Sequence, residues 1–262
     1  MRILITIAFF VVGFVACKGG GSAGGPQATP TPQVSPGAEA LADLKALLFA
    51  DQSLEELLDM VEPTQTPPPN DPLTLFASSV SSSRNNNAED ARKYLQQVLS
   101  QRDTETRVQL WAWKGLRTLG DRPPEDVADV VQGVVCELHN EAGVGTLAAY
   151  ADGRARWIGA QGAAIVWEVP GRDAGIEARI RKLLKAAEPL VRSAPLSDTH
   201  QKEEPKLDHF RVSILTYNGI RTVEVFGPEI EQSQPIAQVL TSSVDLLDAL
   251  SKKSEETKKE QK

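Results

Sequence analysis

The sequence predicts an α+β fold: an antiparallel meander of about four strands plus a second hairpin, covered by amphipathic helices and preceded by a helical segment. The first observation is the run of short segments in residues 130–168, where side chains alternate at the period of two that a strand requires. The second is a pair of dipeptides, Asp152-Gly153 and Asn218-Gly219, which suit the tight turns of hairpins. The third is helical apolar spacing on both sides of the meander.

The stretch before the meander is predicted to be helical. Residues 38–62 place leucines three or four positions apart and predict a pair of accessory helices. Residues 63–70 are a Pro-rich linker, because consecutive prolines cannot continue a helix, and we take this linker as the boundary of the main domain, residues 71–250. Asp71 followed by Pro72 is a helix start, and two longer helices are expected before the meander.

The meander begins with a strand whose two faces differ. One face is expected to carry Gln132, Val134, Cys136 and Leu138, and the other Val135, Glu137 and His139. Turns are predicted at residues 141–143, at Asp152-Gly153 and at residues 159–162, so that four strands follow one another. A lone cysteine on an apolar strand face usually behaves as a small buried hydrophobe, and this is the prediction for Cys136.

The remainder of the domain alternates helix and hairpin. Asp173 is the expected N-cap of a helix with a continuous apolar stripe, and residues 193–206 are predicted to be polar and mobile. The second hairpin follows, and Pro235 opens a last helix whose apolar positions end at Leu250. Residues 251–262 form a charged tail without an apolar residue, for which disorder is expected.

The N-terminus carries the features of a secretion signal. Arg2 precedes an uninterrupted apolar run that is shorter than the ~20 residues needed to span a bilayer, so residues 1–16 are predicted to be a signal peptide. The tetrapeptide Phe14-Val15-Ala16-Cys17 resembles the lipobox of bacterial lipoproteins, although Phe14 stands where leucine is usual. The resemblance implies cleavage before Cys17 and attachment of a diacylglycerol to its sulfur. The alternative is an unprocessed N-terminal anchor in which Cys17 is incidental.

Residues 17–37 fit that resemblance as a tether. They are rich in Gly and Ser and then in Pro and Thr, with no apolar content to fold. The resemblance implies a protein held at the cell envelope through its N-terminal lipid. Because Lys18 rather than Asp follows the cysteine, the same analogy favours the outer membrane over the inner membrane in an organism with both.

Charge and motifs exclude several classes of function. The chain of 262 residues has a formal charge of −7 and no basic stripe, so nucleic acid is not an expected partner. The stretch beginning Gly143-Val144-Gly145 partly matches a dinucleotide fingerprint, but a strand rather than a helix is expected to follow, which favours a hairpin turn. No cofactor is therefore expected.

The histidines raise a metal site as an alternative. His139 with Glu137 and Glu141 lies near a strand end, and His209 in a distant strand supplies a further donor for a ligand set. Zinc sites usually show tighter His and Cys spacing, so surface polar residues are the simpler interpretation and no metal is predicted.

The hairpin at Asp152-Gly153 holds the candidate ligand contacts: Arg154, Arg156, Trp157 and Trp167. An arginine beside a tryptophan can stack on a ligand or bind an anionic group. The alternative is that both tryptophans are packing residues of the sheet while both arginines are solvated.

The body of the chain is similar to uncharacterised bacterial proteins that share a helix, a pair of prolines and an A-Y-x-D-G-x-x-R-W/Y hairpin, here Ala149 to Trp157. The resemblance covers roughly residues 71–250. It supports the domain boundary and carries no activity or catalytic residue to this chain.

These observations favour a lipid-anchored envelope protein whose domain binds or scaffolds another envelope component, and they favour a non-enzymatic role. The first alternative is a small-molecule-binding sensor, which a deep apolar cavity near Trp157 and Trp167 would support. The second is a hydrolase or metalloenzyme, which the convergence of His139 and His209 with carboxylates would support.

Overall fold

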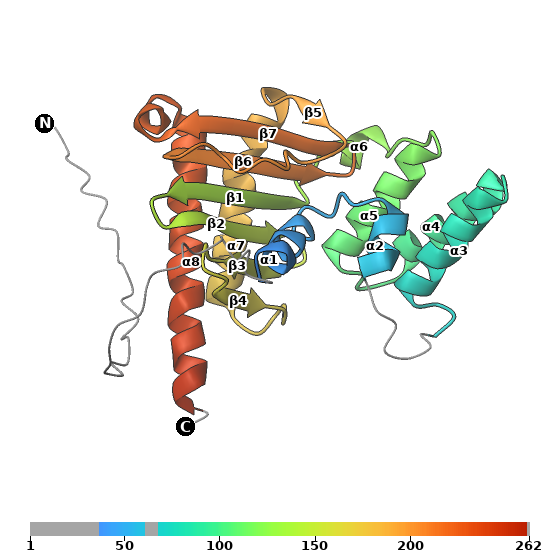
Figure 1. Ribbon diagram of the computed structural model, residues 1–262, viewed down its shortest axis with the longest axis horizontal. Helices are drawn as coiled ribbons and strands as arrows, with labels where there is room; N and C mark the ends of the chain where they lie inside the picture. Colours follow the sequence, from blue (N-terminus) through green and yellow to red (C-terminus); the bar gives the residue numbers. More distant parts are fainter. Residues whose placement is uncertain (1–36, 61–67, 261–262) are drawn as a thin grey trace, which may run out of the picture. The chain divides into compact units, whose positions relative to one another are not determined.

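The structure is a computed structural model and describes residues 37–60 and 68–260 (Figure 1). The predicted signal peptide, Cys17 and nearly all of the predicted tether therefore lie outside the described residues. Within the described ranges, no helix combines the length and the apolar content that a membrane span requires.

The α-helices and strands follow the predicted order, except that a short strand lies within residues 193–206, which were predicted to be polar and mobile. The α-helices are α1 (Gly37–Ala46), α2 (Leu54–Met60), α3 (Pro72–Arg84), α4 (Ala88–Ser100), α5 (Thr106–Thr118), α6 (Glu125–Ala128), α7 (Ala174–Ala187) and α8 (Gln234–Glu260). The strands are β1 (Gly133–Asn140), β2 (Gly143–Tyr150), β3 (Ala155–Ile158), β4 (Ala164–Trp167), β5 (Leu196–Ser197), β6 (His209–Thr216) and β7 (Gly219–Phe226). Two short 3₁₀ helices, η1 (Glu188–Arg192) and η2 (Gly227–Gln232), follow α7 and β7.

The strands form one antiparallel sheet in the order β4-β3-β2-β1-β6-β7-β5. The predicted α+β class, meander and second hairpin are confirmed, and pairing of β1 with β6 joins the meander to that hairpin. Gly153 has a φ of +86° at the β2–β3 turn, a value that glycine adopts without strain. In the second hairpin, Thr216 pairs with Gly219, so the turn lies one residue earlier than the sequence indicated.

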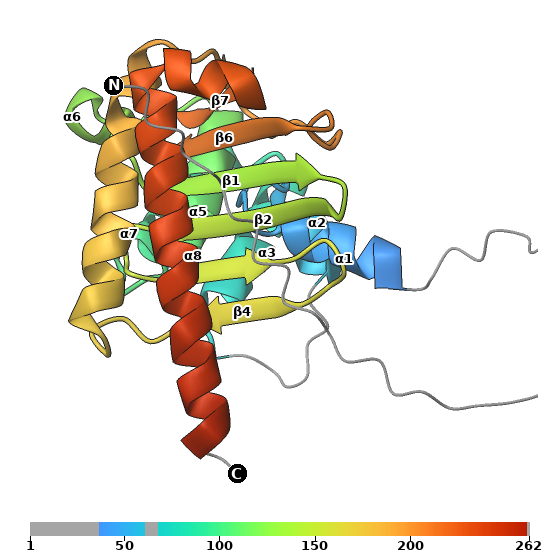
Figure 2. The same cartoon turned by 90° about the vertical axis from the view of Figure 1, so that its left-hand side faces the viewer.

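One face of the sheet packs on α7 and α8, which lie side by side across the strands (Figure 2). Alternate residues of the central strands, such as Val134, Val212 and Ile214, are fully buried there. The helix stripe predicted after Asp173 meets them, and the Asp173 side chain accepts hydrogen bonds from the first turn of α7 as an N-cap. More apolar strand residues are buried on this face than on the opposite face of the sheet.

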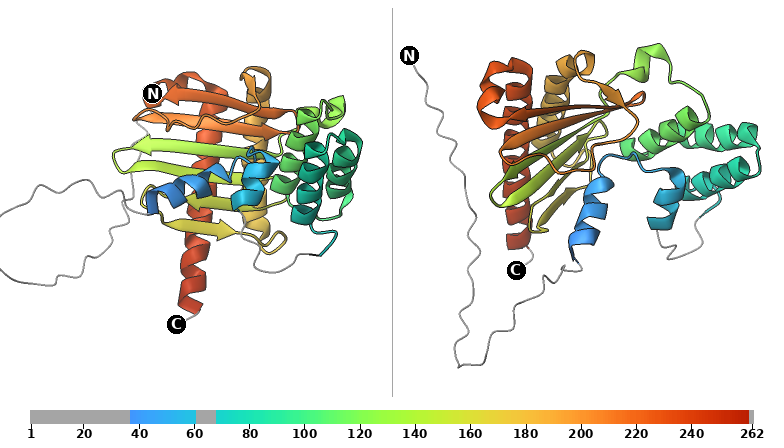
Figure 3. Two further views of the ribbon diagram at one scale, coloured as in Figure 1. Left: turned by 45° about the vertical axis from the view of Figure 1, so that its right-hand side comes forward. Right: turned by 45° about the horizontal axis from the view of Figure 1, so that its top comes forward.

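The opposite face of the sheet divides into an apolar part and a polar part. The apolar part, which includes Val135, Tyr150 and Leu215, all at most 1% exposed, belongs to one core cluster with residues of α1 to α5. In this cluster α3 and α4 lie beyond α5, away from the sheet (Figure 3). The polar part consists of Glu137, Thr146, Arg211, Ser213, Thr222 and Glu224, which we name the polar patch. A sheet face that is buried and polar requires partners for its hydrogen-bonding groups.

The prediction that residues 38–62 are accessory is wrong. Leu48, Phe49 and Leu57 are buried in the same core as residues of the sheet. The described residues of this segment and the sheet belong to one compact unit. The Tyr150 hydroxyl donates to the Leu48 carbonyl at 2.7 Å, and the Trp111 indole donates to Gln52 at 3.1 Å. The spacing of the leucines could not predict these buried contacts, because each contact joins residues far apart in the sequence.

The prediction of a disordered tail is also wrong for residues 251–260, which continue α8. The C-terminal end of the helix extends beyond β4, which is an edge strand of the sheet (Figures 1 and 2). Among its residues up to 257, the last buried position is Leu250, as predicted, but a packed helix propagates without a new nucleation step. Lys253 and Glu256, three positions apart, form an ion pair at 3.1 Å that supports the extension.

Candidate functional site

The four predicted ligand contacts do not come together. Trp157 pairs with Leu147 and packs with Trp167 against the α7–α8 side of the sheet. Arg156 is the neighbour of Trp157 along β3, and neighbouring residues of a strand point to opposite faces. The Arg156 side chain is therefore directed away from both tryptophans, and the proposed stacking surface is not formed.

The two arginines are instead paired with carboxylates. Arg154 forms ion pairs with Asp152 at 2.9 Å and with Glu168 at 3.3 Å. Arg156 also bonds to Glu168 and lies 3.5 Å from Glu105, at the start of α5. Both arginines are therefore largely neutralised by neighbouring carboxylates, and Arg156 links the hairpin to the start of α5. The packing role expected for the tryptophans in the alternative interpretation agrees with the structure.

The histidine metal site is absent from the part of the chain that the structure describes, since no cluster of three or more His, Cys, Asp and Glu side chains could hold an ion there. His139 is 2.6 Å from the Pro205 carbonyl, and the ring of His209 packs on Phe226 with 5.4 Å between centroids. The His139 ring therefore contacts the main chain, and the His209 ring packs on the side chain of its cross-strand partner.

Cys136 is buried at 4% exposure on the α7–α8 face, as the sequence predicted. Burial raises the pKa of its thiol well above the ordinary range, although a hydrogen bond with Ser243 acts in the opposite direction. A thiol that remains protonated and shielded from solvent is a poor nucleophile. Cys136 therefore has a packing role.

The polar patch is the most distinctive group of side chains in the fold. Its two central charged residues are buried, since Arg211 in β6 is 3% exposed and Glu137 in β1 is 8% exposed. The hydroxyls of Ser213 and Thr222 lie 3.2 Å apart on adjacent strands. Thr146 is fully buried, and its hydroxyl has no hydrogen-bond partner among the described residues.

Arg211 holds the patch together through two carboxylates that it contacts unequally. Its Nε and Nη2 donate to one oxygen of Glu224 at 2.9 and 2.7 Å, whereas Nη1 reaches Glu137 only at 3.5 Å. Burial acts to raise the pKa of Glu224, but the hydrogen bonds from Arg211 and the Lys206 amide outweigh it and lower that pKa. Burial raises the pKa of Glu137 because its weaker contact with Arg211 does not compensate for lost hydration.

The patch is covered by residues 198–206, the segment between β5 and β6, which we name the strap. The sequence predicted a mobile polar segment here. The strap contains no helix or strand, and Pro205 is its one buried residue. Its main chain is held by contacts with the patch below it, while most of its polar side chains are exposed to solvent.

Most of these contacts reach the main chain of the strap. Arg211 Nη1 donates to the carbonyls of Glu203 at 2.6 Å and Gln201 at 3.4 Å. Glu224 accepts a hydrogen bond from the Lys206 amide at 3.2 Å. Arg211 and Glu224 therefore bind each other and the strap at the same time.

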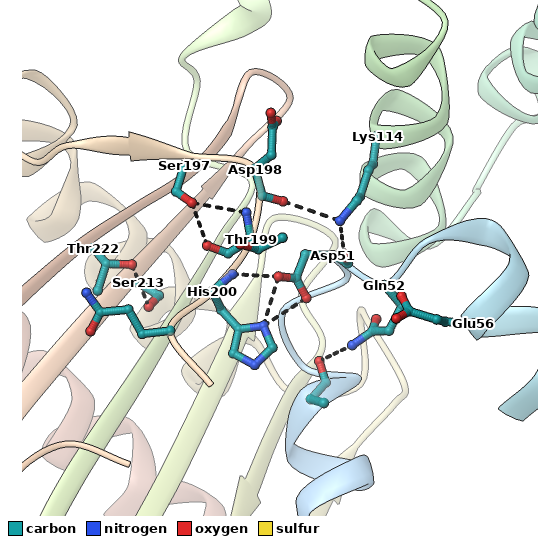
Figure 4. A network of polar contacts seen from close by, with 12 residues as sticks. Asp51, Gln52, Glu56, Lys114, Ser197, Asp198, Thr199, His200, Ser213 and Thr222 are labelled. Atoms are coloured by element: carbon teal, nitrogen blue, oxygen red, sulfur yellow. Dashed lines mark hydrogen bonds and ion pairs between the residues drawn. The ribbon is translucent and has the colours of Figure 1, made fainter. Parts of the chain in front are cut away.

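His200 anchors the first half of the strap on Asp51, in the segment between α1 and α2 (Figure 4). Asp51 accepts a hydrogen bond from the His200 amide at 2.6 Å, and His200 Nδ1 lies 2.8 Å from the same carboxylate oxygen. The imidazole stacks on the ring of Phe49 with 4.2 Å between centroids. Lys114 donates to the main-chain carbonyls of Asp51 and Asp198, which joins α5 to this contact.

An aspartate that orients a histidine also occurs in hydrolases, where the second ring nitrogen removes a proton from a nucleophile. Among the described residues, no Ser, Thr or Cys side chain is hydrogen-bonded to His200. The Asp51 side chain also binds the backbone amide of His200, which fixes the strap as well as the ring. We therefore interpret the pair as a structural anchor.

Sequence reasoning missed this site because its members are widely separated. Asp51 and His200 are 149 positions apart, and Glu137 and Arg211 are 74 positions apart. The available signal was the polar face shared by Arg211 and Ser213 in β6 and by Thr222 and Glu224 in β7. Two adjacent strands with a polar face indicate either solvent or a polar cover, and the sequence alone does not decide between them.

A cavity of about 490 Å³ lies elsewhere, on the α7–α8 side of the molecule. It is lined by Asp129, Val130, Val131, Glu188, Val191, Arg192 and Arg221. Neither Trp157 nor Trp167 contributes to it, so it is not the apolar cavity that the small-molecule alternative required.

Comparison with known proteins gave no family match, no match to a curated protein and no match to a solved structure. The function is therefore argued from the residues of this chain.

The unequal pairing of the two carboxylates predicts a pH dependence. Because the pKa of Glu137 is raised above its ordinary value of 4.5, the folded state binds a proton that the unfolded state releases just above this pH. The contribution of Glu137 is most favourable below pH 4.5 and is lost as the pH rises through the folded pKa. The pKa of Glu224 is lowered, so its contribution to the free energy of unfolding has the opposite pH dependence. That contribution is present above pH 4.5 and is lost as the pH falls through the folded pKa.

The comparison that isolates Glu137 is urea unfolding of wild type and Glu137→Gln at a series of pH values between about 4 and 8. The free energy of unfolding of wild type, relative to the variant, is expected to fall as the pH rises and then to level off. A difference that stays constant or increases would show that Glu137 does not have a raised pKa.

Proposed function

We propose that the protein is a lipid-anchored component of the bacterial cell envelope and that its α+β domain is a binding or scaffolding module. The address is supported by the lipobox-like Phe14-Val15-Ala16-Cys17 and by the Gly- and Pro-rich residues that follow. A lipid on Cys17 and a tether of this composition would hold the folded domain away from the membrane surface. The outer membrane is the favoured location where two membranes exist.

The observation that carries the binding role is the buried polar patch under the strap. Enzymes hold acids, bases and nucleophiles where a substrate can reach them, and the ionisable groups here hold one another and the strap. Hydrogen bonds to the main chain of an extended segment are one of the ways in which domains recognise a polypeptide. This favours a partner protein over a reaction.

The anchor is tested by comparing wild type with Cys17→Ser in bacterial cells. Wild-type protein is expected to partition into detergent and to show a mass increased by a diacylglycerol after loss of residues 1–16. The variant is expected to lose both properties, since the thioether requires the Cys17 sulfur. Aqueous-phase protein of identical, lipid-free mass from both chains would contradict the proposed address.

A further inference from the structure

We propose that the polar patch, with Asp51 and Phe49 at its border, is a binding site for an extended peptide segment of a partner protein, and that the strap is an internal occupant of this site. The inference deepens the proposed function and rests on it, because it names the chemistry that the binding module would recognise. The strap marks where the partner binds.

The main-chain contacts of the strap define the chemistry of the ligand. Arg211 donates to the carbonyls of Gln201 and Glu203, which are two positions apart, and in an extended chain such carbonyls point to the same side. Asp51 and Glu224 accept the amides of His200 and Lys206. These four contacts involve no side chain of the strap, so an extended peptide of different sequence can form them.

The strap side chain with the most specific contacts in the site is the ring of His200. The ring lies parallel to Phe49, with an angle of 9° between the planes, and its Nδ1 faces both oxygens of Asp51 at 2.8 and 3.0 Å. A flat ring with an N–H donor satisfies both the stacking and the carboxylate. The expected ligand is an extended segment with a histidine, or a comparable N–H-bearing ring, at this position.

The strap is suited to leave the site. Its side chains are exposed except for the buried Pro205 and for His200, whose side chain is 11% exposed, so the apolar surface that lifting it uncovers is limited to the surroundings of these two residues, including the ring of Phe49. It has no strand pairing of its own, while β5 and β6 at its two ends remain paired in the sheet. Displacement therefore opens the patch without separating the strands.

Fluorescence polarisation with a labelled peptide of residues 197–206, SDTHQKEEPK, tests the inference directly. The receptor is the full chain carrying Cys17→Ser and a Gly/Ser sequence of equal length in place of the strap. The peptide is titrated to concentrations on the order of millimolar, the effective concentration that attachment to the chain provides. Saturable binding is expected, at least tenfold tighter than to the chain with its native strap, which competes.

Two controls assign the binding to the site. The same peptide carrying His200→Ala, and the strap-replaced receptor carrying Asp51→Ala, are each expected to reduce affinity at least tenfold. If the strap-replaced chain keeps native circular dichroism and tryptophan fluorescence but binds both peptides equally, or neither, the inference is overturned.

A second receptor covers the case in which strap replacement prevents folding. In this receptor, His200→Ala in the otherwise native chain weakens the attachment of the strap to the site and leaves the site itself unchanged. The variant is expected to bind the wild-type peptide at least tenfold more tightly than the unsubstituted chain does. Equal affinities would also overturn the inference. Because these receptors carry Cys17→Ser, failure of the lipid anchor leaves this result unaffected, and the two proposals are tested separately.

Discussion

Replacing Arg211 with glutamine is expected to lower the free energy of unfolding at pH 7 by about 3–5 kcal/mol, the usual effect of removing one partner from a buried ion pair. Arg211 is 3% exposed and contacts Glu224, Glu137 and two strap carbonyls. Glutamine keeps part of the hydrogen bonding but removes the guanidinium charge from two carboxylates whose side chains are 11% exposed in Glu137 and 21% exposed in Glu224. No other single polar change in the patch removes as many contacts.

The measurement is urea unfolding of Arg211→Gln, with Arg179→Gln as the matched control. Arg179 pairs with Asp245 at 3.1 Å, but both side chains are more than a third exposed, so the control is expected to lose at most about 1 kcal/mol. Equal losses in the two variants would show that water reaches the patch and that the strap does not cover it.

Asp51→Ala is expected to release the strap while the sheet remains folded. The substitution removes the acceptor of the His200 amide and the partner of its ring, contacts of a charged group that are worth about 1.5–3 kcal/mol. Trypsin cleavage after Lys202 and Lys206 tracks the population of the open strap, and each 1.4 kcal/mol is about a tenfold change in that population. Cleavage in the strap is therefore expected to accelerate at least tenfold.

Asp198→Ala is the control for that comparison. Asp198 also lies in the strap, and its side chain pairs with Arg117 at 3.2 Å, but that side chain is 76% exposed. An exposed pair contributes little, so cleavage is expected to change less than about threefold. Similar rates for wild type, Asp51→Ala and Asp198→Ala would mean that Asp51 does not hold the strap.

The sheet and its covering helices could be predicted because each depends on local pattern. The Asp152-Gly153 turn, the alternation in β1 and the Asp173 N-cap each require information from only a few neighbouring residues, and all three are found. The tail after Leu250 was misjudged because composition alone does not show that it continues a packed helix.

The candidate site could not be predicted because its chemistry is assembled by topology. The pairing of Arg156 and Trp157 in the sequence suggested a single surface, yet adjacent strand positions face opposite sides of the sheet. Arg211 and Asp51 gave no such signal, since their partners are distant in sequence and their burial depends on the strap. An ordinary polar loop sequence and a strap over a buried patch have the same composition.

Native-state hydrogen exchange tests most directly whether the strap can leave the patch while the domain stays folded, as the account requires. The amides of His200 and Lys206, bound to Asp51 and Glu224, are expected to exchange through a local opening that leaves the β1–β6 ladder protected. Their opening free energy should lie several kcal/mol below that of the amides between β1 and β6. Equal opening free energies would show that the strap leaves only when the whole domain unfolds, which contradicts a displaceable strap over a peptide site.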